Sequence, residues 1–248
     1  MTALKAEQFH ALHVRGNPLV LFNVWDPGSA KAVTAAGAKA IATGSWSVAH
    51  AHGFEDGEKL PLAMAIDNLR RIVSATSLPV SIDLESGYGD TVGEAVRLAI
   101  DAGAVGCNLE DSFPGTGRLR TTEDQCDRIR IARKAADGLR FFINVRTDVF
   151  FATPREQHAE PLVDEVLRRA RAYAEADADG LFVPGLVNID WIARVAQESP
   201  LPLNVMVSEG TPPLRVLAEH GVARVSHAGG PYRIAMKALE DAARAAIG

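Results

Sequence analysis

The stretch PVSIDLESGYGDTVGEAVRLAIDAGAVGCNLED, residues 79–111, decides the fold. It begins and ends with two short apolar runs, PVSIDL at 79–84 and AVGCNLE at 104–110, and the segment between them ends in the helix-stop sequence AGA at 102–104. Nearly continuous apolar runs with little alternation are typical of strands that are buried on both faces of a parallel sheet. The stretch therefore predicts a strand–helix–strand unit with parallel strands.

The same unit recurs along the chain. Six further apolar runs have the same character, namely LVLFNV (19–24), KAIAT (39–43), RFFINVR (140–146), GLFVP (180–184), PLNVMV (202–207) and VARVSH (222–227). Helix signals stand between them, such as Pro27 and Pro231 at first helical positions. Eight strands that alternate with about as many helices in 248 residues predict a (β/α)8 TIM barrel. This barrel is expected to form a single domain over residues 1–248. A doubly wound sheet is the alternative, but the first strand is followed by NVWDPGSA and not by GxGxxG.

The composition excludes several classes of protein. The chain has 31 acidic and 26 basic residues, a net charge of −5 and no basic block, so we expect no nucleic-acid partner. No apolar run approaches the roughly 18 residues of a membrane span, and the N-terminal sequence MTALKAEQFHALHVRG lacks signal-peptide features. The two cysteines, Cys107 and Cys126, form no CxxC pair, so we expect neither a disulfide scaffold nor a structural zinc site, and a cytoplasmic location.

Acidic side chains gather at the predicted carboxyl ends of the strands, where TIM barrels hold their active sites. Asp83 and Glu85 are two residues apart on the third strand, so their side chains should point the same way, and Glu110 ends the neighbouring strand. Converging carboxylates need a cation between them, and such oxygen ligands suit Mg²⁺, with Mn²⁺ as the alternative ion. Arg146, one strand further on, is placed to grip a carboxylate or phosphate. A metal and an arginine together suit a small oxo acid whose carbonyl is polarised toward an enolate.

Each of these assignments has a structural alternative. Asp83 and Glu85 could form turns or cap a helix, since SGYGD follows them, and Arg146 could be a structural ion-pair partner of Glu110. We nevertheless favour the metal site, because several strand ends agree.

Other polar and aromatic side chains also stand at strand ends. Trp25 and Trp46 could wall a substrate pocket or belong to the core. Asn204, on the seventh strand, is a candidate substrate ligand. Asp111 and Asp148 are expected to cap loops or to form ion pairs behind the site.

Five motifs, in order along the chain, carry a resemblance to a known superfamily. They are TGSW (43–46), HGFED (52–56), DLESGYGD (83–90), NLEDS (108–112) and NVRTD (144–148). The set resembles the isocitrate lyase/phosphoenolpyruvate mutase superfamily. The resemblance implies a barrel enzyme that binds Mg²⁺ and acts on a 2-oxo acid or phosphoenolpyruvate-like anion through an enolate. It also implies a homo-oligomer, a tetramer or a dimer, often with the last helix swapped between subunits.

The resemblance further assigns roles to individual residues. Asp83, Glu85 and Glu110 match metal-site carboxylates, which often act through water, and Asp56 matches an acidic residue on the loop after the second strand. Gly44 and Ser45 match the loop whose backbone amides hold the substrate carboxylate, and Arg146 matches the substrate-gripping arginine. We therefore expect catalytic roles for Arg146, Asp56 and Glu110, and substrate contacts from Gly44, Ser45, Trp46, Trp25, Asn204 and Arg146.

The sequence departs from the superfamily pattern in the loop after the fourth strand. The lyases carry K-[KR]-C-G-H there, whereas this chain reads SFPGTGRLRTTEDQCDRI at 112–129. Cys126 falls inside the following helix, behind a capping box of Thr122 and Gln125, so we do not expect it to be the catalytic cysteine. Residues 112–120 could be a mobile lid or a plain surface loop, and we expect Arg120 in this loop to be solvated. The lysine and asparagine of the phosphonomutase loop are missing as well, and Pro184 stands where that branch has a histidine.

Three hypotheses about function follow. The leading one is a Mg²⁺-dependent enzyme that cleaves or rearranges a C–C or C–P bond next to the carbonyl of a small 2-oxo acid or phosphoenolpyruvate-like anion. The second is an unrelated phosphate-binding barrel that uses the segment 226–230 after the eighth strand. The third is a protein that binds 2-oxo acids without turnover.

Overall fold

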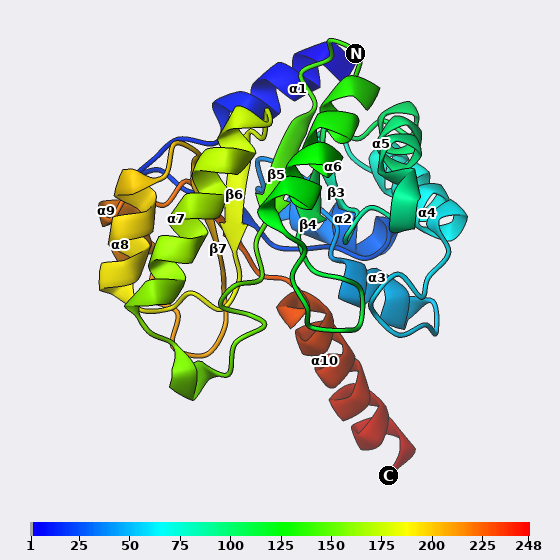
Figure 1. Cartoon of the computed structure of the whole chain (residues 1–248). Coiled ribbons are helices and arrows are strands. Elements are labelled where there is room, and N and C mark those ends of the chain that lie inside the picture. The colour runs from blue at the N-terminus through cyan, green and yellow to red at the C-terminus, as the bar shows by residue number, and fades with distance from the viewer. Residues whose placement is uncertain (1) are drawn as a thin grey trace.

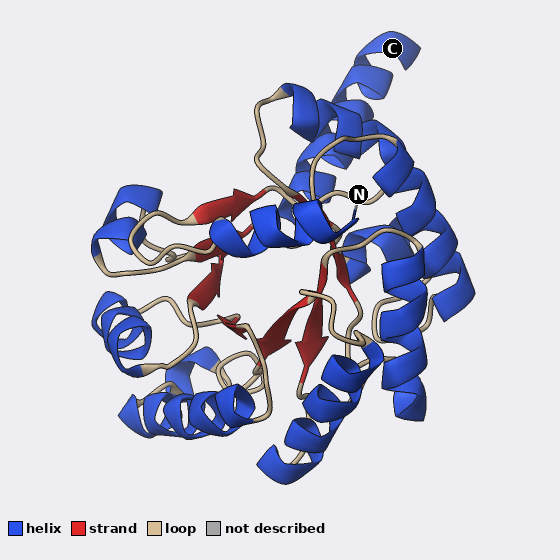
Figure 2. Cartoon of the chain, turned by 90° about the horizontal axis from the view of Figure 1, so that it is seen from above, coloured by secondary structure: helices blue, strands red, loops and turns tan. Residues whose placement is uncertain are grey.

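The computed structural model describes residues 2–248, in which eight parallel strands form a nearly closed ring surrounded by helices (Figures 1 and 2). The strands are β1 (Leu19–Leu21), β2 (Ile41–Ala42), β3 (Val80–Asp83), β4 (Gly106–Glu110), β5 (Phe142–Arg146), β6 (Gly180–Val183), β7 (Leu203–Met206) and β8 (Arg224–Ser226). The helices are α1 (Thr2–Ala11), α2 (Pro27–Ala35), α3 (Ser45–Ala51), α4 (Leu62–Ser74), α5 (Val92–Asp101), α6 (Thr122–Ala135), α7 (Glu160–Glu175), α8 (Ile189–Glu198), α9 (Leu214–Glu219) and α10 (Gly230–Ile247), with 3₁₀ turns at Gly89–Thr91 and Arg155–Gln157. Each strand falls within one of the eight apolar runs, so the predicted (β/α)8 architecture is confirmed.

The ring is continuous except between its first two strands. The strands pair in the order β1-β8-β7-β6-β5-β4-β3-β2, and all the pairings are parallel. Between β1 and β2 the ring is completed just beyond their ends by a bridge from Val24 to Thr43. There the Val24 N–H donates to the Ala42 carbonyl at 2.9 Å and the Gly44 N–H donates to the Val24 carbonyl at 3.3 Å. The barrel mouth therefore has backbone from all eight strands around it.

Most strands are shorter than the apolar runs that predicted them. The run at 19–24 becomes β1 over Leu19–Leu21, and the run at 79–84 becomes β3 over Val80–Asp83. The residues that follow the strands at their carboxyl ends turn into the loops that form the barrel mouth. The apolar pattern indicates burial and not strand pairing, and Val24 and Leu84 are fully buried although both lie beyond the ends of their strands.

The hydrophobic core lies mainly between the strands and the surrounding helices. Amphipathic helices such as α4 and α7 bury one face against the sheet, with Leu69, Ile72 and Val166 fully buried. A second cluster lies under α1, which crosses the ring of strands in Figure 2. There Phe9 packs edge-on against Phe142 at 5.6 Å between ring centroids.

Two helix starts show how local sequence sets the element boundaries. α2 begins at Pro27 as predicted, and the Asp26 carboxylate before it accepts the Ser29 N–H at 2.7 Å. α6 is capped by Thr121, whose hydroxyl accepts the Asp124 N–H at 3.1 Å. The predicted capping box of Thr122 and Gln125 is therefore wrong by one residue, because two threonines in succession can serve and Thr121 is the one with extended backbone.

Only the first turn of the last helix packs on the barrel, where Pro231 is buried and Tyr232 contacts Trp25 and Trp46. α10 extends away from the body of the molecule (Figure 1), and Ile234, Leu239 and Ile247 on it are 64%, 63% and 88% exposed. None of the helices within residues 2–248 combines the length and apolar character needed to cross a bilayer.

Candidate active site

Two adjoining pockets occupy the mouth of the barrel at the carboxyl ends of the strands. The larger has a volume of about 450 Å³ and the smaller about 310 Å³, and both are lined by Ser45, Asp56 and Arg146. Asp83 lines the larger pocket and Glu110 the smaller one. The structure therefore gathers most of the predicted catalytic side chains around one connected space.

Asp83 ends β3 with one carboxylate oxygen bound and one free. Its Oδ2 accepts the backbone N–H of Ser45 at 3.1 Å. Its Oδ1 is buried and has no hydrogen-bond partner. A buried carboxylate oxygen without a partner is costly unless a cation or a water fills the position. This oxygen is therefore the strongest indication of a ligand position in the site.

Glu85 belongs to the same acidic cluster, but it does not lie on the strand as the sequence predicted. β3 ends at Asp83, and Glu85 has a left-handed backbone with φ of 51°. The prediction that strand alternation aligns Asp83 with Glu85 is therefore wrong. Glu85 is instead held by the Glu58 backbone N–H, which donates to its Oε2 at 2.6 Å.

The acidic cluster opposes its own ionisation. Burial raises the pKa of the Glu85 carboxyl to about 8, and the negative charges of Asp56 and Asp83 add to the rise. Burial and the charge of Asp83 likewise raise the pKa of Asp56. Burial also raises the pKa of Glu110, although the neighbouring Arg146 opposes this shift. The mouth thus carries more carboxylates than its resident positive charge can neutralise.

The three carboxylates predicted as metal ligands do not form a direct ligand set. Within residues 2–248, no three His, Cys, Asp or Glu side chains converge closely enough to hold one ion together. Glu110 is engaged elsewhere, because its Oε2 lies 3.0 Å from Arg146 Nη1 and its Oε1 accepts the Ser112 hydroxyl at 2.9 Å. The arrangement fits an ion whose contacts to most of these carboxylates run through water.

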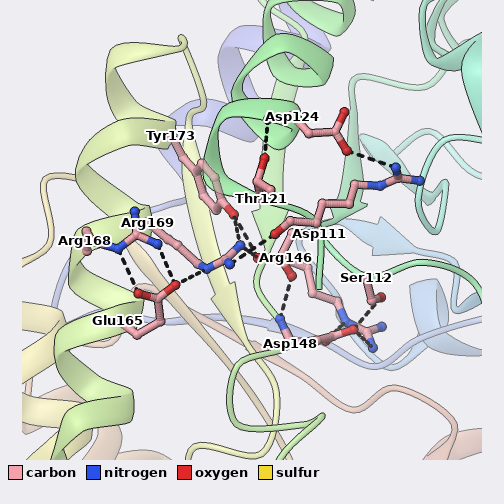
Figure 3. Close-up of polar contacts among 11 residues, drawn as sticks. Asp111, Ser112, Thr121, Asp124, Arg146, Asp148, Glu165, Arg168, Arg169 and Tyr173 are labelled. Carbon is pink, nitrogen blue, oxygen red and sulfur yellow. Dashed lines mark hydrogen bonds and ion pairs between the residues drawn. The ribbon is translucent and has the colours of Figure 1, made fainter. Parts of the chain in front are cut away.

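Arg146 is held in place by two carboxylates, those of Asp148 and Glu110. Its Nε and Nη2 donate to the two oxygens of Asp148 at 2.6 and 3.0 Å (Figure 3), and its Nη1 lies 3.0 Å from Glu110 Oε2. The Ser112 hydroxyl lies within hydrogen-bond distance of both acids, 2.8 Å from Asp148 and 2.9 Å from Glu110, so its single proton is shared between them. These negative partners raise the pKa of the Arg146 guanidinium against the effect of burial. Arg146 is thus both the ion-pair partner of Glu110 and a pocket-lining cation.

A buried hydrogen-bond network around Asp111 fixes the backbone of Asp148, which in turn holds Arg146. The Asp111 carboxylate is fully buried and accepts Arg169 Nη1 at 2.9 Å and the Tyr173 hydroxyl at 2.8 Å (Figure 3). Its other oxygen accepts the backbone N–H of Asp148 at 3.0 Å. Both Asp111 and Asp148 form ion pairs as expected, but only that of Asp111 lies behind the site, because Asp148 itself lines the smaller pocket.

The loop at 44–46 lines the larger pocket, but two of its N–H groups are already paired. The Gly44 N–H donates to the Val24 carbonyl and the Ser45 N–H to Asp83. The Trp46 side chain also lines this pocket, with Arg233 stacked over its ring at 4.3 Å. The predicted grip of these amides on a substrate carboxylate stays a prediction.

Two other predicted substrate contacts lie away from the pocket surface. Trp25 packs edge-on against Tyr232 at 5.1 Å and lines neither pocket. Asn204 lies inside the barrel, where its amide is paired with Asn144, Ser226 and backbone carbonyls. The structure gives these two side chains structural contacts, and their contact with substrate stays a prediction.

The segment after β8 offers little to a phosphate group. The His227 N–H donates to the Asn23 side-chain oxygen at 3.0 Å and to the Leu21 carbonyl at 3.0 Å. The Ala228 N–H donates to the same Asn23 oxygen at 2.9 Å. These donors are already satisfied by the protein, so the segment does not favour the phosphate-binding alternative.

The loop 112–120 forms a small hairpin beside the smaller pocket. Ser112 and Leu119 form an antiparallel bridge, and Arg120 stacks over the Phe113 ring at 4.1 Å. Arg120 also pairs with Asp124 at 3.1 Å and is buried, so the expectation that it is solvated is wrong. Arginine buries its stem readily when its charge is paired and its plane is stacked.

Cys126 lies in α6, as predicted, and takes no part in the pocket. It is buried, its thiol lies 3.4 Å from the Ala172 carbonyl, and burial raises its pKa. A buried thiol with a raised pKa is a poor acid or nucleophile at neutral pH.

The main feature that sequence reasoning missed is Glu58. Its Oε1 accepts the Ser86 hydroxyl at 2.7 Å and the Tyr88 N–H at 2.8 Å, while its own backbone N–H holds Glu85. Its left-handed backbone, with φ of 61°, has no signal in the sequence beyond the neighbouring Gly57. Glu58 therefore links the loop after β2 to the loop after β3.

Comparison with known proteins agrees with this geometry. The family model for phosphoenolpyruvate phosphomutase matches residues 9–247. The 2-methylisocitrate lyase of Escherichia coli is 29% identical over 248 aligned residues, which cover 95% of this chain and 80% of the lyase. A solved structure from Burkholderia cenocepacia, described as a candidate phosphonomutase, is 54% identical with a TM-score of 0.96, covering 99% of this chain and all of that one.

A more distant structure shares the fold. It is a phosphonopyruvate hydrolase solved in complex with oxalate and Mg²⁺, with 24% identity and a TM-score of 0.83, covering 96% of this chain and 84% of the hydrolase. The match over nearly the whole chain shows that this protein belongs to the phosphoenolpyruvate phosphomutase family, within the isocitrate lyase/phosphoenolpyruvate mutase superfamily of lyases, mutases and hydrolases.

Proposed function

We propose that this protein is a Mg²⁺-dependent enzyme that acts on a small 2-oxo acid or phosphoenolpyruvate-like anion and cleaves or rearranges a C–C or C–P bond through an enolate. The observation that carries the proposal is the acidic cluster at the barrel mouth. Its central carboxylate, Asp83, keeps a buried oxygen without a partner, and its neighbours Asp56 and Glu85 have raised pKa values. A divalent cation would neutralise this cluster.

The residues present fit such an ion in a particular way. Asp83 would hold Mg²⁺ through its free oxygen, while Glu85, Asp56 and Glu110 would hold its water ligands. Mn²⁺ would fit the same oxygen donors. When bound, the ion supplies electrostatic stabilisation of the negative charge that develops on the carbonyl oxygen of the substrate.

The chain's own residues would bind and orient the substrate. Arg146 is fixed by Asp148 and Glu110 and still faces both pockets, so it would grip a carboxylate or phosphonate group with little loss of side-chain entropy. Gly44, Ser45 and Trp46 would bind the other end of the same group. Glu110 would act by holding Arg146.

Asp56 is the proposed proton donor or acceptor. It lines both pockets, and its raised pKa brings proton exchange closer to neutral pH. The loop 112–120 contains no cysteine, histidine or carboxylate, so it cannot supply the acid that the lyases carry there. We therefore place the proton transfer at the Asp56 carboxylate.

We further propose that the protein is a homo-oligomer in which α10 packs on a second subunit. α10 exposes Ile234 and Leu239, and an apolar groove of about 400 Å³ lies elsewhere on the barrel against β1 and α2, lined in part by Val20, Phe22 and Val33. Each subunit thus has exposed apolar side chains on an amphipathic helix and an uncovered apolar groove. The two buried free cysteines, Cys107 and Cys126, suit the reducing cytoplasm proposed as its location.

Replacing Asp83 tests the metal assignment. The Asp83→Asn variant keeps the shape of the side chain but removes its charge, so Mg²⁺-dependent turnover should fall by on the order of 100-fold or more. Turnover is measured on a panel of oxaloacetate, 2-oxoglutarate and pyruvate, with and without EDTA. The control is Asp90→Asn, because Asp90 is exposed and lies beyond the pocket. Unchanged Mg²⁺ dependence in the Asp83 variant would refute the assignment, and binding without turnover in the wild type would support a non-catalytic protein.

Replacing Glu85 tests the electrostatics of the cluster without a substrate. The unfolded chain ionises Glu85 near pH 4.5, whereas the folded protein holds the proton until about pH 8. The free energy of unfolding of the metal-free protein should therefore fall as pH rises through this window, on the order of 1.4 kcal/mol per pH unit from this group. Glu85→Gln should remove this part of the slope, so it should be the more stable protein at pH 8, as measured by urea unfolding from pH 5 to pH 9.

The control for this series is Glu94→Gln, an exposed position on α5. If the wild type and the Glu85 variant lose stability in parallel over the whole range, the raised pKa of Glu85 is contradicted.

Removing α10 tests the proposed assembly. A chain that ends at residue 230, and a full-length Leu239→Asp variant, should both have a lower mass than the wild type in light scattering after gel filtration. Lys237→Ala is the control, because Lys237 pairs with Asp241 within the same helix. A wild type that is already monomeric would contradict the proposal.

A further inference from the structure

The inside of the barrel contains a layer of buried amides around one buried arginine. Asn108 on β4, Asn144 on β5, Asn204 on β7 and Arg224 on β8 are each at most 5% exposed. TIM-barrel interiors are usually filled by branched apolar side chains. Buried polar groups of this number need a structural or functional reason.

A glycine on the neighbouring strand β6 makes room for one of these amides. A Cβ atom on Gly180 of β6 would lie 2.6 Å from the side-chain oxygen of Asn144. Only glycine at this position leaves space for the amide, so the polar layer is matched by its neighbours and is not a chance occurrence.

The orientation of each amide follows from its partners. Arg224 Nη2 lies 3.1 Å from one end of the Asn108 amide, and because arginine can only donate, that end must be the oxygen. Asn144 donates a second hydrogen bond to the same oxygen at 2.9 Å. The direction of the Asn144 amide is fixed in turn by Asn204, whose amino group donates to the backbone carbonyls of Val205 and Arg224 and whose oxygen therefore faces Asn144.

The other end of the Asn108 amide faces the larger pocket. Asn108 is one of the residues that line this pocket. Its Nδ2 makes no hydrogen bond within residues 2–248, and it is not among the polar atoms that are sealed from solvent without a partner. Asn108 is also the register partner of Asp83 on the adjacent strand. A free N–H donor, fixed in direction, therefore lies at the floor of the pocket beside the proposed metal carboxylate.

The guanidinium of Arg224 places a positive charge close to this N–H donor. Arg224 is 1% exposed, and no carboxylate pairs with it in the described part of the chain. Its Nε and Nη1 are buried without partners. Burial lowers the pKa of the guanidinium to about 9, while the nearby charge of Asp83 opposes that shift. At neutral pH a buried cation without a direct ion-pair partner in the described residues thus lies beneath the pocket, and this arrangement favours an anion above it.

We propose that Asn108 donates a hydrogen bond to an anionic oxygen of the substrate, and that Arg224 is the positioning residue that fixes its amide. This inference rests on the proposed function, since it adds one donor to the same pocket. It also narrows the ligand class to anions that carry an oxygen acceptor at their inner end, opposite the end held by Arg146.

The test uses oxalate with Mg²⁺ as the probe and isothermal titration calorimetry as the readout. Asn108→Asp keeps the shape and the oxygen that faces Arg224 but replaces the donor with a negatively charged acceptor. Asn108→Ala removes the donor without adding charge. Both variants should bind oxalate on the order of 10- to 100-fold more weakly than the wild type. Asn188→Asp is the control for added charge, because Asn188 is exposed at the start of α8 and an aspartate can cap that helix equally well.

Thermal unfolding separates this role from a structural one. The new carboxylate of the Asn108→Asp variant gives Arg224 a counter-charge, so its melting temperature should equal or exceed that of the wild type while its affinity for oxalate falls. If the wild type binds oxalate and both Asn108 variants bind it equally well, Asn108 only supports Arg224 and the inference is overturned. If the wild type does not bind oxalate with Mg²⁺, the proposed function fails and this inference fails with it.

Two substitutions at Arg224 test the positioning role. Arg224→Lys retains a donor to the Asn108 oxygen and should keep oxalate affinity within a few-fold of the wild type. Arg224→Met has a similar volume but no donor, so the Asn108 amide can turn over and affinity should fall by about tenfold. Equal affinity in the two variants, with both folded by circular dichroism, would overturn the role assigned to Arg224.

Discussion

The constraint on which the rest of the structure depends is the excess of negative charge at the mouth of the barrel. Four carboxylates, Asp56, Asp83, Glu85 and Glu110, surround connected pockets in which Arg146 is the cation that they share. Like charges at partly buried positions cannot all ionise unless a positive charge lies between them. Without a cation the protein responds by holding protons: burial, together with the negative charges of Asp56 and Asp83, raises the pKa of Glu85 well above its ordinary value. The arrangement is unfavourable for folding alone and favourable for binding a divalent ion.

The surroundings of the cluster are organised to keep it in that state. Behind the mouth, Asp111, Arg169 and Tyr173 form a buried network that fixes the backbone of Asp148 and through it the Arg146 guanidinium. A guanidinium that is already fixed loses little freedom when it binds an anion. Beneath the mouth, the asparagine layer and Arg224 place positive charge and one directed N–H donor under the pocket. A divalent cation held by the carboxylates, together with an anion bound above Asn108 and Arg224, would neutralise both the negative and the positive charge of the pocket.

The strands and their order along the chain could be predicted from the sequence because burial on both faces of a strand leaves a local apolar signature. Much of the site could be predicted for the same reason, since polar residues that interrupt such runs at their carboxyl ends must lie at the barrel mouth. The exceptions depend on contacts between distant segments. Glu85 has a left-handed backbone, and its carboxylate is held by the backbone N–H of Glu58 on another loop.

The residues inside the barrel show more clearly that contacts between distant segments cannot be predicted from local sequence. Whether Asn204 faces a substrate or a neighbouring amide depends on the register of β5, β7 and β8, and a single strand sequence does not contain that register. Arg224 likewise reads as an ordinary charged residue within an apolar run, although the closed ring buries it completely. These residues became interpretable only when the pairing of the strands was known.

The most direct test of the central claim is to locate the cation. Crystals grown with Mn²⁺ and oxalate, and measured at a wavelength where Mn²⁺ scatters anomalously, would show the position of the ion in a difference map. The account predicts one strong peak in contact with the free oxygen of Asp83, with ordered water between the ion and Glu85. A map without a peak in the pocket, or with a lysine or arginine side chain occupying that position, would contradict it.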